Sequence, residues 1–259
     1  MARVVHLVGG GPGTVLALRR HYKAAVAELG KERPLVGHVG TASDDQRGFF
    51  TMIRGGLSAP AHMVLVRIAS PRASMVDARK VLEECDMVFV SGGDVERGID
   101  VLNDRGMAEP LRALSARGKP MFGISAGSIM LGREWVRFPR GDDAHAEIFP
   151  CHGIAPVHMD AHSEDDGWSE LRVLVRLLHE RGDSDPVGYG LTRKGGLRVE
   201  LDGEPRLTPF GTSIPRIVVR RGRVTRGKAL PMDWTAGLAK RSRSESDGVR
   251  LAFQRPIRR

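Results

Sequence analysis

The stretch Pro120-Met121-Phe122-Gly123-Ile124-Ser125-Ala126-Gly127, followed by Ser128-Ile129-Met130-Leu131, decides the fold. Its centre has the pattern G-x-S-x-G, in which a serine stands on a sharp turn between a strand and a helix. Glycines two positions before and after the serine remove side chains that would collide in so tight a turn. Apolar runs on both sides predict the strand and the helix, so Ser125 is the predicted nucleophile. The alternative is a turn of small residues that only packs a helix against a sheet.

Short β-branched runs alternate with helical stretches around this turn, which is typical of a mostly parallel sheet. We therefore expect an α/β fold: a doubly wound, mostly parallel sheet with helices on both faces and added antiparallel strands in the C-terminal half. The predicted strands are 4–8, 35–39, 62–68, 87–90, 119–123, 134–138, 148–159, 186–191, 197–201 and 217–224. The predicted helices are 14–29, with Thr14 as its cap, then 46–55, 74–84, 95–102, 110–117 and 169–180.

The distribution of charge predicts one α/β domain over residues 1–235 and a basic, flexible tail over 236–259. The chain has a net charge of +9, and residues 240–259 contain seven Lys or Arg against two acids. Six more basic residues fall in a hairpin predicted at 216–228. Aromatic residues make up only 5% of the chain, and only Phe253 lies in the tail, so a surface for stacking bases is missing. Nucleic-acid binding is therefore not the expected main function.

Two cysteines, Cys85 and Cys151, form neither a disulfide framework nor a CxxC metal signature. No apolar run approaches the roughly 20 residues that cross a bilayer, and the N-terminal stretch is typical of a first strand rather than a secretory signal. The sequence thus predicts a cytoplasmic protein without a membrane partner.

Three glycine-rich loops, 9–13, 91–94 and 123–127, follow predicted strands, and ligands bind at the carboxyl ends of such strands. The N–H groups of Gly93 and Ala126 are the expected donors to a developing oxyanion. The alternative for the second loop is that Asp94 caps the next helix, and both can hold together. The loop 9–13 lacks the dinucleotide fingerprint, because Thr14 stands at the third glycine position. It is interpreted as a turn at the rim of the site.

A serine nucleophile needs a neighbouring base, and nine histidines are available. Strand alternation places His158, Asp160 and His162 on one face. These three side chains suit a metal ion such as zinc or iron. Alternatively, His162 at the strand end acts alone as the base. The spacing of the residues does not decide between these hypotheses.

The run Gly92-Gly93-Asp94, the turn at 123–127 and Asp160-Ala161-His162 together resemble the dipeptidase E and cyanophycinase family of serine peptidases. The segment 186–191 resembles that family's closing segment, and the likeness extends over roughly residues 3–204. It implies a fold like that of class I glutamine amidotransferases, with Ser125 as nucleophile, His162 as base, and the Gly93 and Ala126 amides as the oxyanion hole. Gly92, Asp94 and Asp160 would then bind substrate.

The resemblance also implies an acid beyond the serine as the third catalytic residue. Asp143 is the preferred candidate, with Asp142 and Glu147 as alternates. The competing interpretation of these residues is an exposed acidic loop.

The chain departs from the cyanophycinases, which typically have glutamine where Val95 and Ala161 stand and arginines where this chain has 163–166. We therefore expect a serine peptidase of small peptides, aspartyl dipeptides among them, with no cofactor. By analogy with the family, the protein is expected to form a homodimer. Two rival hypotheses are a metal-dependent hydrolase that uses His158, Asp160 and His162, and a non-catalytic, ligand-binding member of the same fold.

Overall fold

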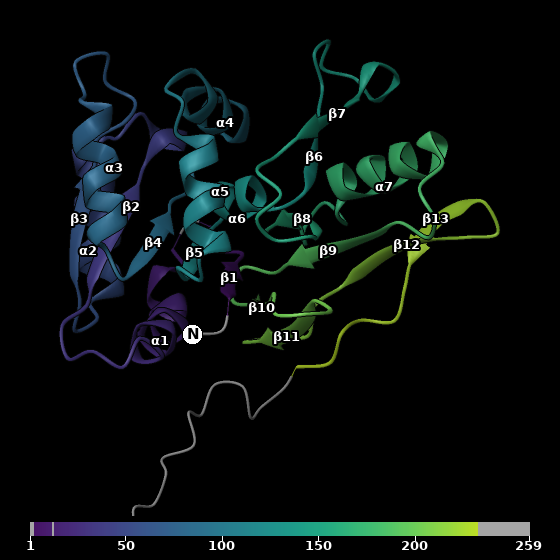
Figure 1. Cartoon of the computed structure of the whole chain (residues 1–259). Coiled ribbons are helices and arrows are strands. Elements are labelled where there is room, and N and C mark those ends of the chain that lie inside the picture. The colour runs from purple at the N-terminus through teal and green to yellow at the C-terminus, as the bar shows by residue number, and fades with distance from the viewer. Residues whose placement is uncertain (1–2, 12, 233–259) are drawn as a thin grey trace, which may run out of the picture.

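The computed structural model describes residues 3–11 and 13–232 (Figure 1). The predicted tail, 236–259, lies outside these residues, and the prediction of a single domain over 1–235 stays a prediction. No helix in the described part of the chain is long and apolar enough to span a membrane. Both cysteine thiols are free.

A seven-stranded sheet forms the centre of the molecule, in the order β11-β10-β1-β5-β4-β2-β3. Its five strands from β1 to β3 are parallel, and β10 and β11 extend one edge in antiparallel fashion. The parallel strands are mostly apolar because both of their faces are covered. The strands are β1 (Val4–Val8), β2 (Leu35–Val39), β3 (His62–Val66), β4 (Met87–Val90), β5 (Met121–Ile124), β10 (Gly196–Glu200) and β11 (Arg206–Phe210).

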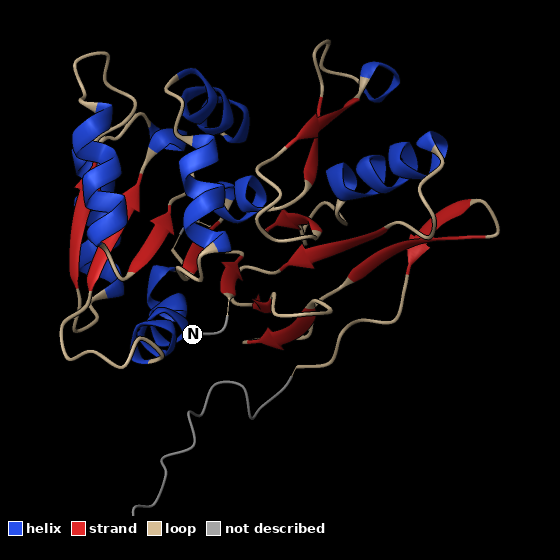
Figure 2. Ribbon diagram, viewed as in Figure 1, coloured by secondary structure: helices blue, strands red, loops and turns tan. Residues whose placement is uncertain are grey.

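Helices lie on both faces of this sheet, and each face has its own apolar core (Figure 2). On one face, α1 and α2 pack on Phe89 and Phe122, whose rings stack with centroids 5.4 Å apart. On the other face, α3 to α6 pack on residues such as Leu7 and Val90. The helices are α1 (Val15–Ala27), α2 (Arg47–Leu57), α3 (Met75–Glu84), α4 (Val95–Asp104), α5 (Ala108–Ala116) and α6 (Ala126–Leu131), with a 3-10 turn η1 (Thr41–Ser43).

Two smaller sheets and the last helix build the second half of the chain. A four-stranded sheet has the order β13-β12-β9-β8, and β6 pairs with β7 in a hairpin. Helix α7 packs on this part through its own apolar cluster. The elements are β6 (Glu134–Arg137), η2 (Asp143–His145), β7 (Glu147–Pro150), β8 (His158–Ala161), α7 (Ser169–Arg181), β9 (Val187–Leu191), β12 (Arg216–Arg220) and β13 (Arg223–Arg226).

The predicted fold class is confirmed, and the errors concern the second half. The strand predicted at 148–159 is wrong: β7 ends at Pro150 and β8 begins only at His158. The segment between them contains Gly153, whose φ is 62°, and Pro156, and neither residue suits a central strand. The hairpin predicted at 216–228 is confirmed as β12 and β13, so the single strand predicted at 217–224 is divided by a turn at Arg221 and Gly222. Strand β11 was not predicted at all.

Thr14 stands at the N-cap position of α1, as predicted, but without a side-chain cap bond. Its hydroxyl donates to the carbonyl of Gly11 at 2.8 Å instead. The side chain therefore holds the glycine loop that follows β1.

Candidate functional site

The three glycine-rich loops follow three adjacent strands, β1, β5 and β4. Val8 is opposite Ile124, and Val90 is opposite Gly123, so the strands end side by side. The loops that continue from them therefore gather at the carboxyl edge of the sheet, where ligands of this architecture bind. This edge is the candidate active site.

Ser125 stands between β5 and α6. Its φ of 55° and ψ of −127° are a backbone conformation that residues other than glycine rarely adopt. Its amide donates to the carbonyl of Val8 at 3.0 Å, which fixes the turn to β1. A Cβ on Gly127 would lie 2.1 Å from the carbonyl oxygen of Val90, and one on Gly123 would lie 2.8 Å from the Cα of Ser128. The two glycines of the pattern are thus required by close backbone packing.

Ser128 ties the same turn to the sheet, a role that the sequence analysis missed. Its buried hydroxyl accepts from the amide of Val8 and donates to the carbonyl of Val8, both at 2.9 Å. Helix α6 is thereby bound to the end of β1. A serine one turn beyond the nucleophile in a short apolar helix is the only signal for this role in the sequence.

His162 lies beside the serine: its Nε2 is 2.8 Å from the Oγ of Ser125. The residue follows β8, has φ 51°, and donates its amide to the carbonyl of Leu191 at 2.8 Å. Gly11 packs against the imidazole, since a Cβ there would lie 3.4 Å from the Cγ of His162. The loop that follows β1 therefore contacts the histidine directly, through Gly11. This pair has the geometry in which imidazole removes a proton from a hydroxyl.

The loop after β4 lies close to the serine. A Cβ on Gly92 would lie 2.9 Å from the Cβ of Ser125. Gly93 has φ 143°, and a Cβ there would collide with the carbonyl oxygen of Ala42. In the described part of the chain, no acceptor is bonded to the amide of Gly93 or of Ala126, so both N–H groups are available to a substrate oxygen. Asp94 caps α4, because its Oδ1 accepts from the amide of Arg97 at 2.8 Å.

The structure does not bring the predicted third residue to His162. Asp143 lies exposed in η2, at the outer end of the β6–β7 hairpin (Figure 2), and its carbonyl accepts from Arg176 at 3.3 Å. The alternates have other partners as well: Asp142 bonds to His145, and Glu147 bonds to Arg137. Within the described ranges no hydrogen bond joins a carboxylate to His162. The assignment of Asp143 therefore stays a prediction.

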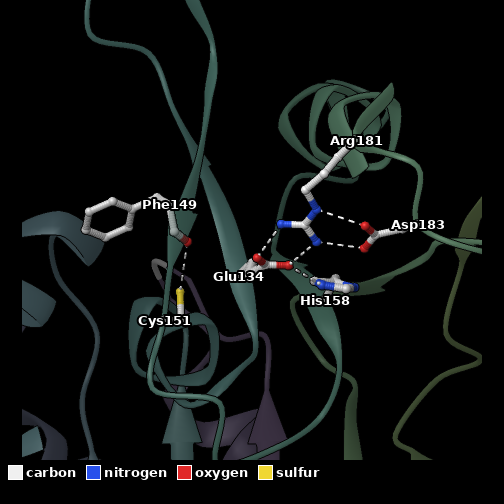
Figure 3. Close-up of polar contacts among 6 residues, drawn as sticks. All are labelled: Glu134, Phe149, Cys151, His158, Arg181 and Asp183. Atoms are coloured by element: carbon white, nitrogen blue, oxygen red, sulfur yellow. Dashed lines mark hydrogen bonds and ion pairs between the residues drawn. The ribbon is translucent and has the colours of Figure 1, made fainter. Parts of the chain in front are cut away.

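His158 does not join Asp160 and His162 in a metal site. Its Nε2 lies 3.0 Å from the carboxylate of Glu134, which also binds Arg181, and Arg181 binds Asp183 (Figure 3). Burial lowers the pKa of His158, and the bond to Arg181 lowers the pKa of Glu134. No group of three His, Cys, Asp or Glu suited to a metal ion occurs within the ranges that the structure covers. β8 ends at Ala161, and the backbone turns at His162, so the side chain of His162 does not share a strand face with His158 and Asp160.

Asp160 is 2% exposed and lies two residues before His162. Its Oδ1 accepts from the amide of Ala161 at 2.7 Å, while its Oδ2 has no partner in the described part of the chain. Burial raises the pKa of Asp160 to about 6. Burial, with added repulsion from Asp160 and Asp166, also raises the pKa of Glu170 to about 7. Asp160 and Glu170 are thus two neighbouring carboxyl groups whose pKa values burial raises.

Comparisons with known proteins agree with this fold. The most similar curated sequences include the pyridoxal 5'-phosphate synthase subunits PdxT of Bacillus cereus (strain AH187) and Geobacillus sp. (strain WCH70). Each is 32% identical to the chain over 84 residues, which are 32% of this chain and 41% or 42% of the PdxT protein. The match thus spans about two-fifths of the length of PdxT.

Two solved structures share the fold over most of their length. A peptidase from an acI-B1 Actinobacterium superposes with a TM-score of 0.64 at 16% identity, covering 90% of this chain and 98% of that one. A putative peptidase E protein from Listeria monocytogenes EGD-e gives 0.58 at 13% identity, covering 82% and 100%. Residues 9–199, most of the chain, match the model of peptidase family S51, which confirms the family resemblance. The chain therefore belongs to peptidase family S51, a family of serine peptidases.

Proposed function

We propose that the protein hydrolyses small peptides through an acyl-enzyme formed on Ser125. The observation that carries the proposal is the 2.8 Å contact between the Oγ of Ser125 and the Nε2 of His162. The turn that presents the hydroxyl is held by backbone packing on both sides. A preorganised serine and histidine are the parts that nucleophilic acyl transfer requires.

In the proposed reaction, His162 takes the hydroxyl proton as the Oγ of Ser125 attacks the carbonyl carbon of the peptide bond. The oxyanion that forms accepts hydrogen bonds from the amides of Gly93 and Ala126, at the start of α6. When the intermediate collapses, the C–N bond breaks and His162 gives its proton to the leaving amine. A water molecule then attacks the acyl-enzyme, again with His162 as base, and releases the acid.

The family and the surroundings of the serine support a small-peptide substrate. Gly92 packs on Ser125, and Gly11 packs on His162, so glycine backbone borders the reacting pair. Aspartyl dipeptides stay the preferred class, although Asp94, in the loop after β4, adds a carboxylate that would disfavour acidic side chains of the substrate. A dipeptide library that contains aspartyl, neutral and basic residues at each position tests this preference.

Labelling with a fluorophosphonate probe tests the nucleophile, because an unactivated serine does not react with it. We expect stoichiometric labelling of the wild type and none of Ser125→Ala or His162→Ala, each with an unchanged circular dichroism spectrum. Ser184→Ala is the matched control, since Ser184 is exposed in the loop before β9, at the end of that strand opposite Leu191. Peptide hydrolysis by folded Ser125→Ala at the wild-type rate would disprove the proposal.

A further inference from the structure

The hairpin of β12 and β13 is a strongly basic projection. It extends beyond β9 and α7 at one end of the molecule (Figure 1). Among the described residues, none of its exposed cations forms an ion pair with an acidic side chain. These cations are Arg220, Arg221, Arg223, Arg226 and Lys228.

The excess of basic over acidic residues is confined to the region of the chain that begins with this hairpin. Residues 1–210 contain 27 Lys or Arg and 28 Asp or Glu, so they are close to neutral. Residues 211–259 contain 13 Lys or Arg and only three acids, and 211–232 contain no acid at all. The part of the chain that builds the site thus balances its charges, whereas the hairpin does not.

At two positions of the hairpin an arginine stands where the local structure disfavours it. Arg220 is directly opposite Arg223 in the register, and like charges in that position repel each other. Arg221 and Gly222 form the turn with φ of 50° and 72°, where Asn, Asp or Gly is preferred at the first position. A charged edge strand also prevents aggregation. That role needs neither the opposed pair nor an arginine in the turn.

The hairpin tip is far from the reacting pair. Val218 is opposite Val187, four residues before Leu191, which accepts from the amide of His162. Arg221 lies three residues further in the opposite direction. At about 3.3 Å per residue, the tip is about 23 Å from the end of β9 where His162 lies. A ligand on the hairpin therefore does not occupy the candidate active site.

We propose that the hairpin binds double-stranded nucleic acid through its phosphates, without reading sequence. Four of its five exposed cations are arginines, whose guanidinium groups bind phosphate oxygens in pairs. A two-stranded ribbon fits the major groove of a duplex. The hairpin has no aromatic side chain on which single-stranded bases could stack, and phosphate binding to a duplex requires none. Binding would hold the peptidase on a nucleic acid and leave its site open.

Fluorescence anisotropy with a labelled 20-base-pair duplex of arbitrary sequence tests the proposal on the full chain. The key variant is Arg220→Gln/Arg221→Gln/Arg223→Gln/Arg226→Gln. Each lost phosphate contact changes the slope of log K against log salt by about 0.9, so we expect the slope to fall by about three to four. The affinity at 100 mM salt should fall at least about tenfold. A second duplex of unrelated sequence should bind equally well.

The matched control removes four exposed cations from the near-neutral body: Arg20→Gln/Lys23→Gln/Arg47→Gln/Arg72→Gln. We expect it to bind the duplex within about twofold of the wild type. Arg221→Asn gives a second, gentler test, because asparagine suits the turn and should keep the hairpin folded while lowering the slope by about one. Fluorophosphonate labelling of all variants should equal that of the wild type.

Three outcomes would overturn the proposal. They are equal duplex binding by the wild type and the hairpin variant, no duplex binding at 50 mM salt, and tighter binding to poly-glutamate than to the duplex. The last outcome would assign the hairpin to an acidic polypeptide. None of the three bears on the labelling of Ser125, so the proposed peptidase activity is tested separately.

Discussion

The Nε2 of His162 lies 2.8 Å from the Oγ of Ser125, and both residues have a left-handed backbone, with φ of 51° and 55°. Each conformation is held by a bond to another strand: Ser125 donates to Val8, and His162 donates to Leu191. The geometry of the pair is therefore set by the two sheets rather than by the two loops alone.

Gly92→Ala should impair catalysis more than stability. The new methyl group would lie 2.9 Å from the Cβ of Ser125 and 3.3 Å from its Oγ, so the hydroxyl must shift. Small displacements of a reacting group reduce rates strongly, and we expect kcat/KM to fall at least about tenfold. Gly48→Ala is the control, because nothing lies within 4 Å of its Cβ and it should preserve activity. A variant Gly92→Ala with full activity would show that the two loops are less closely packed.

Ser128→Ala should destabilise the protein by about 2–3 kcal/mol, because two bonds to Val8 are lost and a buried amide is left without a partner. Urea unfolding measures this change. Ser91→Ala is the matched control: Ser91 is equally buried, but its hydroxyl makes a single, longer bond of 3.4 Å to Val39. An equal loss in the two variants would contradict the proposed anchoring role of Ser128.

Asp160→Asn should change how stability depends on pH. Burial raises the pKa of Asp160 to about 6, whereas its ordinary value is 3.8. As pH rises from about 4 to about 6, the unfolded chain loses this proton first, so the wild type loses stability over that range. Asparagine does not ionise, so the variant should gain up to about 3 kcal/mol relative to the wild type between pH 4 and pH 7.

Unfolding in urea at both pH values measures this gain, with Asp104→Asn as the control because Asp104 is exposed at the end of α4. A constant difference between Asp160→Asn and the wild type at the two pH values would show that Asp160 ionises normally.

Asp143→Asn tests the predicted third residue. Loss of the acid from a catalytic triad lowers kcat by roughly ten-thousandfold, and this is the result expected if Asp143 orients His162 during the reaction. Asp142→Asn and Glu147→Gln are compared in the same assay, since each has another partner in the structure. Activity of Asp143→Asn within about threefold of the wild type would assign the residue to the exposed loop.

The sequence was sufficient for the parts of the fold that depend on local pattern. Ser125 and its flanking glycines lie within five residues, and the strands of the parallel sheet are continuous apolar runs. Asp94 was also recognised as a cap from its position alone. In each case the deciding residues are neighbours in the chain.

Contacts between distant segments were not predictable in this way. His158 bonds to Glu134, which is 24 residues away in the chain, and the residue pattern of neither strand predicts this contact. Strand β11 is short and contains Pro209, which disfavours a strand assignment unless the residue lies at an edge. The bend at His162 removes it from the face that alternation predicted, and that bend depends on pairing with Leu191.

The bond from the amide of His162 to the carbonyl of Leu191 also bears on biosynthesis. A chain emerging from the ribosome contains the nucleophile turn well before it contains β9 and β10. Until β9 has left the exit tunnel, the bond that fixes the backbone of His162 cannot form. The order of residues along the polypeptide thus places the formation of this bond after the synthesis of Leu191, 66 residues beyond Ser125.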